Sequence, residues 1–510
     1  MRSATWKAIL LIGLTSLAGG FALNGLVEGW VSLQGALGSA VLLAAVGLLL
    51  WLSLGITASP RWVGMAVSIA FLLRLLVGVG LSLALPVWGH ESEVSRAGYL
   101  FFDAYTRDRQ AWELAQSGNS ILSAFGNEFS GDQYGGMLAL SALIYRLLSP
   151  EVHRPYLILI LTAFAAAAAV PFFYQAVRKY FGASVAELAV WIYVFYPESV
   201  LLGASQMRDP ILIGLGGAAF WMTSRWQDVA RRMTVGLFLT LAVTAVFSYL
   251  VALPLAGVLF LWWWVEFSPQ VKQPIIRRMV WIGVALAFAV ILLGMAAWLR
   301  ETALWDARLT EAGSGKIQSL FKSLPDRLEL PFLVVYGLLQ PVLPAALFDP
   351  SKPLWTVISS LRSLGWYLIL PLLGYVPFGL RWQKQGLQRN LIFLTLMVVL
   401  GWSLLSSFRA GGDLWDNPRY RTLLLPWLAL LASWAYLTAR QYRDVWLARL
   451  LACEGVFLLT FGVWYANRSF RLGLDLPFLQ VAGMTGVLCG LILAAGYWHD
   501  QRQRIKTGTR

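Results

Sequence analysis

Charged residues are scarce in this chain, and their scarcity excludes an ordinary soluble domain. Asp, Glu, Lys and Arg make up 13% of 510 residues, while 58% are hydrophobic; soluble domains carry roughly 25% charged residues. The two cysteines, Cys453 and Cys489, lie in apolar stretches, which excludes a disulfide framework and a thiolate metal site. The three histidines, His90, His153 and His499, are too few and too scattered for a histidine metal cluster.

The net charge of +14 would indicate a nucleic-acid partner in a soluble protein. In so apolar a chain it indicates the excess of Lys and Arg in cytoplasmic loops and contact with anionic lipid. Membrane lipids are therefore expected partners, and nucleic acid is not. The chain also contains 25 Trp, including the run Trp262-Trp263-Trp264, which fits aromatic anchoring at the membrane interfaces.

Apolar runs of about 16–25 residues recur along the chain, and each is long enough to cross a bilayer. They predict an all-α polytopic membrane protein with about fourteen transmembrane helices, no soluble domain and no internal repeat. The first run resembles a signal peptide, but a second run follows almost at once, so we interpret it as a retained helix. The runs lie near residues 8–23, 35–57, 62–86, 155–176, 184–204, 210–224, 234–250, 252–267, 279–298, 358–379, 390–408, 421–438, 446–465 and 478–497.

Basic residues in the short loops predict the orientation of the chain. The connections at residues 24–34 and 248–251 carry no Lys or Arg, so both termini are expected in the cytoplasm of a plasma (inner) membrane protein. The long loops at 87–154 and 299–357 then face outward. The basic residues that fall on the cytoplasmic side are Arg61, Arg178, Lys179, Arg225, Arg231, Arg232, Lys272, Arg277, Arg278, Arg381, Lys384, Arg389, Arg440, Arg443 and the tail Arg502–Arg510.

Three shorter segments do not fit a full span. Asp103 to Gln116 predicts an amphipathic helix in the first outer loop, with Gly118-Asn119 as its stop. Tyr134 to Leu148 is apolar but short, which suits a helix lying along the interface. Pro331 to Phe348 carries three prolines, and we expect it to be re-entrant or to lie on the surface.

Two acids, Asp103 and Asp209, fall on the predicted outer face where a membrane protein rarely keeps a carboxylate without a use. A carboxylate costs roughly 2.5–3.5 kcal/mol at the middle of a membrane helix, and less near an end. The alternative for each acid is helix capping, which Pro210 favours for Asp209. Asp108 is a further candidate acid, although a solvated helix face would also explain it.

Arginines near the same face are candidates for binding a phosphate, because a guanidinium offers paired donors that match phosphate oxygens. These are Arg208, Arg419 and Arg421. Snorkelling at a helix end is the alternative for all three, and ion pairing with neighbouring Asp413 and Asp416 is a further one for the last two. Arg74, midway along the third run, is costly to bury and should have a structural partner.

Several motifs follow one another in an order that resembles a known family. They are Asp103-Ala104-Tyr105 with Leu114–Gly118, Asp132-Gln133-Tyr134-Gly135, Arg178-Lys179-Tyr180-Phe181-Gly182, Tyr196-Pro197-Glu198, Arg208-Asp209-Pro210 and Asp416-Asn417-Pro418-Arg419-Tyr420-Arg421. Together they resemble the GT-C superfamily of integral membrane glycosyltransferases, and most closely the branch of lipid A aminoarabinose transferases and protein O-mannosyltransferases. The resemblance covers residues 62–440, and Gln133-Tyr134 departs from the Lys-Pro or Pro-Pro of the family.

The resemblance implies a GT-C-like catalytic core at residues 62–440. Two additional helices precede it in residues 1–61, and C-terminal helices with a basic cytoplasmic tail follow in residues 441–510. The implied reaction moves one sugar from a polyprenyl-phosphate carrier to an acceptor on the outer face, and lipid, protein and glycan acceptors stay open.

The implied reaction assigns roles to the candidate residues. An inverting displacement needs a base for the acceptor hydroxyl, for which Asp103 is the candidate, and Asp209 would orient a substrate. The resemblance places Tyr105, Asp108 and Tyr420 beside the arginines as substrate-binding candidates. Asp103 and Asp209 could also supply oxygen ligands to Mg²⁺ or Mn²⁺, so metal dependence stays open.

Two other classes of function are compatible with the same features. A transporter or flippase of lipid-linked sugars would show inverted repeats and acids near the middle of the membrane, and neither is seen in this sequence. A polymerase or ligase of surface glycans would share the outer loops and arginines, and it would depend less on Asp103.

Overall fold

The computed structural model describes residues 2–507, apart from residues 127–128, 130–131, 287–288, 291–325 and 349–350. This part of the chain is all-helical and contains no strand, as the apolar runs predict. Nine of its helices are long and apolar enough to cross a membrane, or up to eleven if each bent helix pair is one span. The chain is a multi-pass membrane protein.

The described residues thus hold fewer spans than the fourteen runs predict, for three reasons. Run 210–224 forms a helix of 17 residues, which is short for a span. Runs 234–250 and 252–267 join in one bent helix, Ala230–Phe267. Run 279–298 lies partly outside the described residues.

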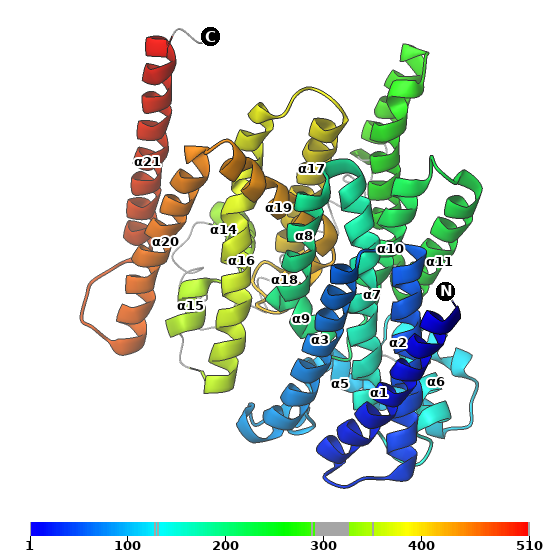
Figure 1. Cartoon of the computed structure of the whole chain (residues 1–510). Coiled ribbons are helices and arrows are strands. Elements are labelled where there is room, and N and C mark those ends of the chain that lie inside the picture. The colour runs from blue at the N-terminus through cyan, green and yellow to red at the C-terminus, as the bar shows by residue number, and fades with distance from the viewer. Residues whose placement is uncertain are drawn as a thin grey trace. The chain divides into compact units, whose positions relative to one another are not determined.

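The described chain divides into two compact units. The first unit comprises Met1–Trp264 with Thr422–Ala429, and the second comprises Val265–Arg421 with Leu430–Arg510. The elements of the first unit are α1 (Arg2–Glu28), α2 (Leu33–Ile56), α3 (Arg61–Trp88), α4 (Glu93–Arg96), α5 (Phe102–Gln116), η1 (Ile121–Phe125), α6 (Gly136–Leu148), α7 (Tyr156–Phe181), α8 (Ala183–Phe195), α9 (Pro197–Gly203), α10 (Asp209–Arg225) and most of α11 (Ala230–Phe267) (Figure 1).

Helix α7 is the core of the first unit, and α2, α3, α8 and α10 pack around it. Small residues let the helices approach closely, which is the usual basis of helix packing in membranes. Gly214 of α10 lies so near α7 that a Cβ there would be 2.4 Å from the carbonyl oxygen of Ala165. Gly216, two residues further along α10, faces open space.

The break between α8 and α9 is stabilised by Arg74 of α3. Pro197 has no N–H, so the carbonyl of Tyr193 lacks its usual donor four residues ahead. The fully buried guanidinium of Arg74 donates to the carbonyls of Tyr193 and Val194, each at 3.3 Å, and to Ser199 Oγ at 2.9 Å. The prediction of a structural partner is confirmed, and the main partners are carbonyls rather than an acid.

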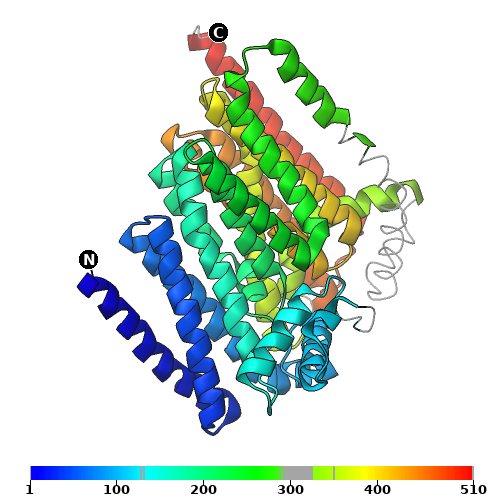
Figure 2. The same ribbon diagram turned by 90° about the vertical axis from the view of Figure 1, so that its right-hand side faces the viewer.

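Helix α11 is a hairpin of two arms that bend at Ser248, whose φ of −168° and ψ of 106° are not helical. The N-terminal arm contacts the end of α10, because Trp226 Nε1 donates to Thr234 Oγ1. The C-terminal arm returns to the same end, where the rings of Trp226 and Trp263 are 5.3 Å apart. Figure 2 shows the two arms side by side. The bend coincides with the short connection expected at residues 248–251.

The first unit therefore has two distinct ends. At one end, Gln175 of α7 bonds to the carbonyl of Thr57, and Lys179 donates to the carbonyl of Ser224, so the basic loops after α2, α7 and α10 gather there. The other end holds α5, α6 and the connection between α1 and α2, and we call it the α5–α6 end (Figure 1). There, Arg154 pairs with Glu28 at 2.6 Å.

The amphipathic helix predicted from Asp103 to Gln116 is confirmed as α5, and the short apolar helix predicted up to Leu148 is confirmed as α6. The segment 331–348 forms parts of two short helices, Asp326–Leu339 and Leu343–Phe348. Neither is long enough to cross a bilayer. The position of segment 331–348 in the membrane stays a prediction.

The second unit is a bundle of long helices with an anchored loop at one end. Asp444, just before α20, accepts hydrogen bonds from Tyr375 Oη at 2.9 Å, Arg381 Nη2 at 2.7 Å and Trp382 Nε1 at 2.6 Å. Its described elements are η2 (Ser268–Gln270), α14 (Asp326–Leu339), α15 (Leu343–Phe348), α16 (Pro353–Gly379), η3 (Leu380–Trp382), α17 (Leu387–Ala410), α18 (Asp416–Thr422), α19 (Leu425–Gln441), α20 (Val445–Phe470) and α21 (Phe478–Thr507), of which α18 and α19 also have residues in the first unit.

Candidate functional site

Asp132 is the structural centre of the α5–α6 end. Its buried carboxylate accepts hydrogen bonds from the backbone amides of Tyr134 at 3.3 Å and of Met137 and Leu138 at 3.0 Å. The last two amides belong to the first turn of α6, whose N–H groups have no partner within the helix. Asp132 therefore caps α6 from outside the helix, although its sequence position before Gly135-Gly136 carries no ordinary capping signal.

Two arginines from other elements converge on the same carboxylate. Arg107 Nε of α5 lies 3.9 Å from Asp132 Oδ2, and Arg208 Nη1, just before α10, lies 3.5 Å from Oδ1. Arg107 is buried, whereas the Arg208 side chain is 16% exposed. Two guanidiniums and the N-terminus of α6 therefore share one carboxylate. The exposed side of Arg208 remains accessible to an anion.

A small pocket adjoins this cluster. It has a volume of about 270 Å³ and is lined by Phe125, Phe129, Asp132 and Tyr134, among others. The guanidinium of Arg208 stacks over the Tyr134 ring at 4.4 Å from the centroid. The Tyr134 ring therefore supports this arginine through a cation–π contact.

The Asp132 cluster brings the segments of the two predicted acids to one end of the first unit. Asp103 lies in the first turn of α5, four residues before Arg107, and it is exposed. Asp209 begins α10, directly after Arg208, and it is buried. Neither acid is the N-cap of its helix, because Phe101 and Arg208 occupy those positions. The capping alternative is therefore wrong in that form, while both acids do lie in the first turn.

Asp108, predicted as a further acid, is buried rather than solvated. Its Oδ2 accepts from Tyr99 Oη at 2.5 Å and contacts His153 Nε2 at 2.9 Å, and its Oδ1 accepts from Tyr145 Oη at 2.5 Å. Burial raises the pKa of the Tyr99 and Tyr145 hydroxyls, and the Asp108 charge raises it further. Both tyrosines therefore stay protonated and act as donors.

Tyr105, three residues before Asp108 on α5, is partly exposed, and its ring meets the Tyr99 ring edge-on with centroids 5.4 Å apart. Its hydroxyl donates to Glu93 Oε1 of α4 at 2.5 Å, and this hydrogen bond raises the pKa of the tyrosine. The guanidinium of Arg109 lies 5.7 Å from the ring centroid. Tyr105 thus ties α4 to α5, and it is a partly exposed member of the predicted substrate-binding set.

The second unit holds the remaining predicted residues, and there ion pairing and carbonyl capping dominate. Arg419 Nη1 pairs with Asp416 Oδ1 at 3.1 Å, and Tyr420 Oη donates to Asp416 Oδ2 at 3.1 Å. The ion-pair alternative is therefore confirmed for Arg419.

Arg421 has a structural environment in the same unit. It is buried, it donates to the carbonyl of Gln340 at 2.5 Å, and its guanidinium lies 3.4 Å from the Trp366 ring centroid. Like Arg74, Arg421 donates hydrogen bonds to backbone carbonyls at the end of a helix. A proline, here Pro341, follows that helix.

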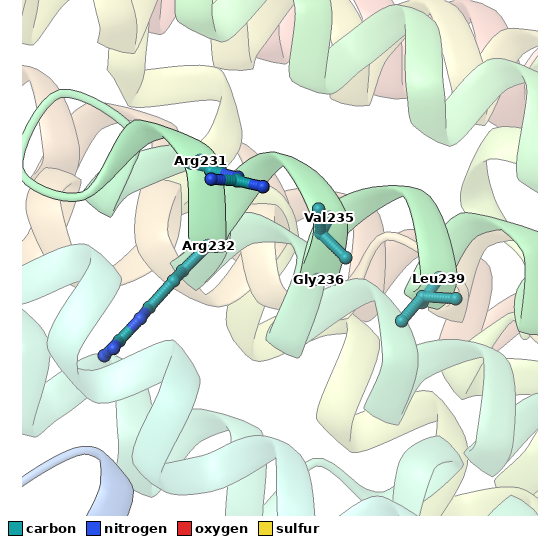
Figure 3. Close-up of a pocket in the computed structure, with 5 residues that line it drawn as sticks. All are labelled: Arg231, Arg232, Val235, Gly236 and Leu239. Carbon is teal, nitrogen blue, oxygen red and sulfur yellow. The ribbon is translucent and has the colours of Figure 1, made fainter.

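A second surface pocket, of about 540 Å³, lies at the start of α11. Its lining is Arg231, Arg232, Val235, Gly236 and Leu239, all from one helix. The two arginine side chains point in different directions (Figure 3). They are exposed and converge on no common point, so this pocket is a basic helix surface and we assign it no ligand.

Among the described residues, no three His, Cys, Asp or Glu side chains are grouped as metal ligands would be. At the α5–α6 end, Asp108 instead pairs with two tyrosines and His153, and Asp132 with two arginines. The possible Mg²⁺ or Mn²⁺ ligation by Asp103 and Asp209 stays a prediction.

Two functional candidates were missed from the sequence. Asp132 was noted only as part of a motif, and His153 only as one of three scattered histidines. A polar residue four positions before α6 and a histidine directly before the buried Arg154 were the available signals, and both are weak without knowledge of the fold. Neither a protein-family model nor a curated protein matches this chain. What its helices show is an all-α, multi-pass membrane protein.

Proposed function

We propose that the protein is a membrane glycosyltransferase. It moves a sugar from a polyprenyl-phosphate carrier to a hydroxyl of a lipid, protein or glycan acceptor. The α5–α6 end faces outward from the plasma membrane, because the basic loops of the first unit gather at its opposite end. A carrier of this kind requires a site at the membrane surface, since withdrawing its tail would cost about 0.8 kcal/mol for each CH₂.

The observation that supports the proposal most is the convergence of Arg107 and Arg208 on Asp132. It joins α5, α6 and the start of α10 at one end of the unit, beside the membrane-crossing helix α7. The sugar leaves with an ionised phosphate, so the site must stabilise that negative charge and accept a proton from the acceptor hydroxyl. Arg208 is the candidate for the phosphate, because it is partly exposed and supported by Tyr134.

Asp103 is the proton acceptor proposed from the sequence, and Asp209 the acid that orients the sugar or the acceptor. The exposure of Asp103 at the start of α5 leaves it accessible to an acceptor arriving from water. In an inverting displacement the base takes the proton of the acceptor hydroxyl, and the acceptor oxygen attacks the anomeric carbon on the face opposite the departing phosphate.

The test is transfer by purified protein in lipid nanodiscs, supplied with a panel of radiolabelled polyprenyl-phosphate sugars and cell-envelope acceptors. We expect turnover of at least one donor, with a loss of about 10²-fold or more in Arg208→Gln. Arg225→Gln is the matched control, because Arg225 is a half-exposed arginine at the opposite end of the first unit, where it pairs with Asp228 at 3.1 Å.

No transfer from any donor by well-folded protein would contradict the proposal. Movement of the intact lipid-linked sugar across the membrane without transfer would indicate a flippase instead. An equal loss of turnover in both arginine variants would remove Arg208 as the phosphate ligand.

A further inference from the structure

The pair Asp108–His153 has the geometry of an oriented proton acceptor. His153 Nε2 lies 2.9 Å from Asp108 Oδ2, and the carboxylate is only 1% exposed while the histidine side chain is 29% exposed. An ionised carboxylate only accepts hydrogen bonds, so Nε2 carries the proton and Nδ1 is left with a lone pair. A buried carboxylate that fixes the tautomer of a histidine is the arrangement found behind catalytic imidazoles.

The imidazole is also held by its neighbours. It stacks on the Trp112 ring with centroids 5.1 Å apart and planes inclined by 23°. The ring of Tyr145 meets it edge-on at 5.0 Å. Tyr99 and Tyr145 occupy further lone pairs of Asp108, so the carboxylate is fixed independently of the histidine.

The backbone around His153 is anchored at the boundary of a membrane-crossing helix. The next residue, Arg154, is buried and bonds to Glu28 at 2.6 Å, Ser149 at 2.8 Å and Ser32 at 3.0 Å. Helix α7 begins two residues later, at Tyr156. A hydroxyl or lipid headgroup at the membrane surface can therefore approach the exposed part of His153.

We propose that His153, oriented by Asp108, takes the proton of the acceptor hydroxyl, a role that the sequence assigned to Asp103. The inference rests on the proposed function and names the group that performs one of its steps. The acceptor O–H bond breaks, and its electron pair forms the new bond to the anomeric carbon. The bond from that carbon to phosphate oxygen breaks, and the electron pair leaves with the polyprenyl phosphate. The proton goes to Nδ1, and the resulting imidazolium is stabilised by Asp108 until water on the outer face removes it.

The charged group in contact with His153, among the described residues, is Asp108. The hydroxyls of Tyr99 and Tyr145 face the same carboxylate from the α4–α5 loop and from α6. The adjacent basic groups point elsewhere, because Arg146 donates to the carbonyls of Leu114 and Asn119, while Arg154 pairs with Glu28. The rate should therefore fall toward acid as the imidazole becomes protonated and can no longer accept a proton.

The first experiment measures transfer and its pH profile in wild type, His153→Gln, Asp108→Asn, Asp103→Asn and the control His90→Gln. We expect His153→Gln to lower kcat by about 10²- to 10⁴-fold and to abolish the acid limb of the profile. We expect Asp108→Asn, the positioning residue, to lower kcat by about 10- to 100-fold, as loss of an orienting partner does elsewhere. His90→Gln should retain wild-type turnover.

The second experiment reads the pair without using activity. The chain has three histidines, so histidine-selective ¹⁵N labelling gives signals from three imidazole rings, each with two nitrogens, and His153→Gln identifies the pair that belongs to His153. We expect the Nε2–H tautomer with an unprotonated Nδ1 in wild type, and loss of this fixed tautomer in Asp108→Asn.

Three results would overturn the inference. These are an Nδ1–H tautomer in wild type, wild-type turnover in folded His153→Gln, or an acid limb lost only in Asp103→Asn. Wild-type protein that transfers no sugar would instead refute the proposed function itself, so the two failures are distinguishable.

Discussion

Removal of the charge on Asp132 should destabilise the first unit more than removal of any exposed acid. Asp132→Asn keeps an oxygen for the amides of Met137 and Leu138, and Asn caps helices about as well as Asp. It leaves Arg107 and Arg208 facing a neutral amide. Removing one partner of a buried charge pair typically costs 3–5 kcal/mol, and the partial exposure of Arg208 places the expected loss toward the lower end, at about 3 kcal/mol. Asp132→Ala should cost about 1 kcal/mol more, because the helix cap is lost as well.

The assay measures the thermal unfolding midpoint in one detergent, at pH 7 and at one scan rate. The scan rate is held constant because large proteins often unfold irreversibly, and the midpoint then depends on it. The matched control is Asp228→Asn. Asp228 also pairs with an arginine, Arg225 at 3.1 Å, but both side chains are about half exposed, and such surface pairs contribute about 0–1 kcal/mol. A midpoint for Asp132→Asn no lower than that of Asp228→Asn would refute the reasoning that Asp132 holds α5, α6 and α10 together.

Three further predictions concern other parts of the chain. Gly214→Ala should destabilise the protein by about 1–3 kcal/mol, seen as a lower thermal unfolding midpoint, because the added Cβ meets the backbone of α7. The control Gly216→Ala, on the same helix, should not lower the midpoint, and equal effects of the two substitutions would contradict the close packing. Burial raises the pKa of the Asp444 carboxyl, but hydrogen bonds from Trp382, the Trp446 amide and Tyr375, together with the charge of Arg381, outweigh burial and hold it below the ordinary 3.8. A carboxyl whose pKa is lowered in the folded state contributes stability that is present at neutral pH and is lost as the pH falls through that pKa. Asp444→Asn should therefore lower the unfolding midpoint at pH 7, and the midpoints of variant and wild type should become equal in acid. A midpoint difference that stays constant with pH would contradict this prediction. In a chain without native cysteines, Glu151→Cys should react with a membrane-impermeant maleimide on intact cells and Arg231→Cys only after permeabilisation, and the reverse pattern would invert the proposed orientation.

Much of the local structure was predictable because it depends on short-range patterns. The length and spacing of apolar runs indicated the helices, and the amphipathic pattern from Asp103 to Gln116 indicated α5 with nearly its observed bounds. The cost of burying Arg74 indicated a structural partner, which the proline-broken α8–α9 connection supplies. The number of spans was less predictable, since a hydropathy pattern does not show whether an apolar run forms a separate helix or one arm of a hairpin.

The candidate site was predictable only in part. The segments that carry Asp103 and Asp209 were identified because acids beside apolar runs are rare and costly. The residues that organise those segments were not, because neither Asp132 nor Asp108 differs from a surface acid in sequence. Asp108 was expected to be solvated, and its burial follows from the packing of α5 against α6, which brings Tyr145 to it from 37 positions away.

The amino-acid sequence by itself determined that this chain lies in a membrane, where its helices run and which loops carry the basic charge. These properties follow from the free energy of transferring each segment between water and lipid, which is a sum over local residues. Only the tertiary structure decided that Arg107 and Arg208 share one carboxylate and that His153 is oriented by Asp108. Those contacts join residues 25 to 76 positions apart, and their existence depends on helix packing that no local pattern encodes.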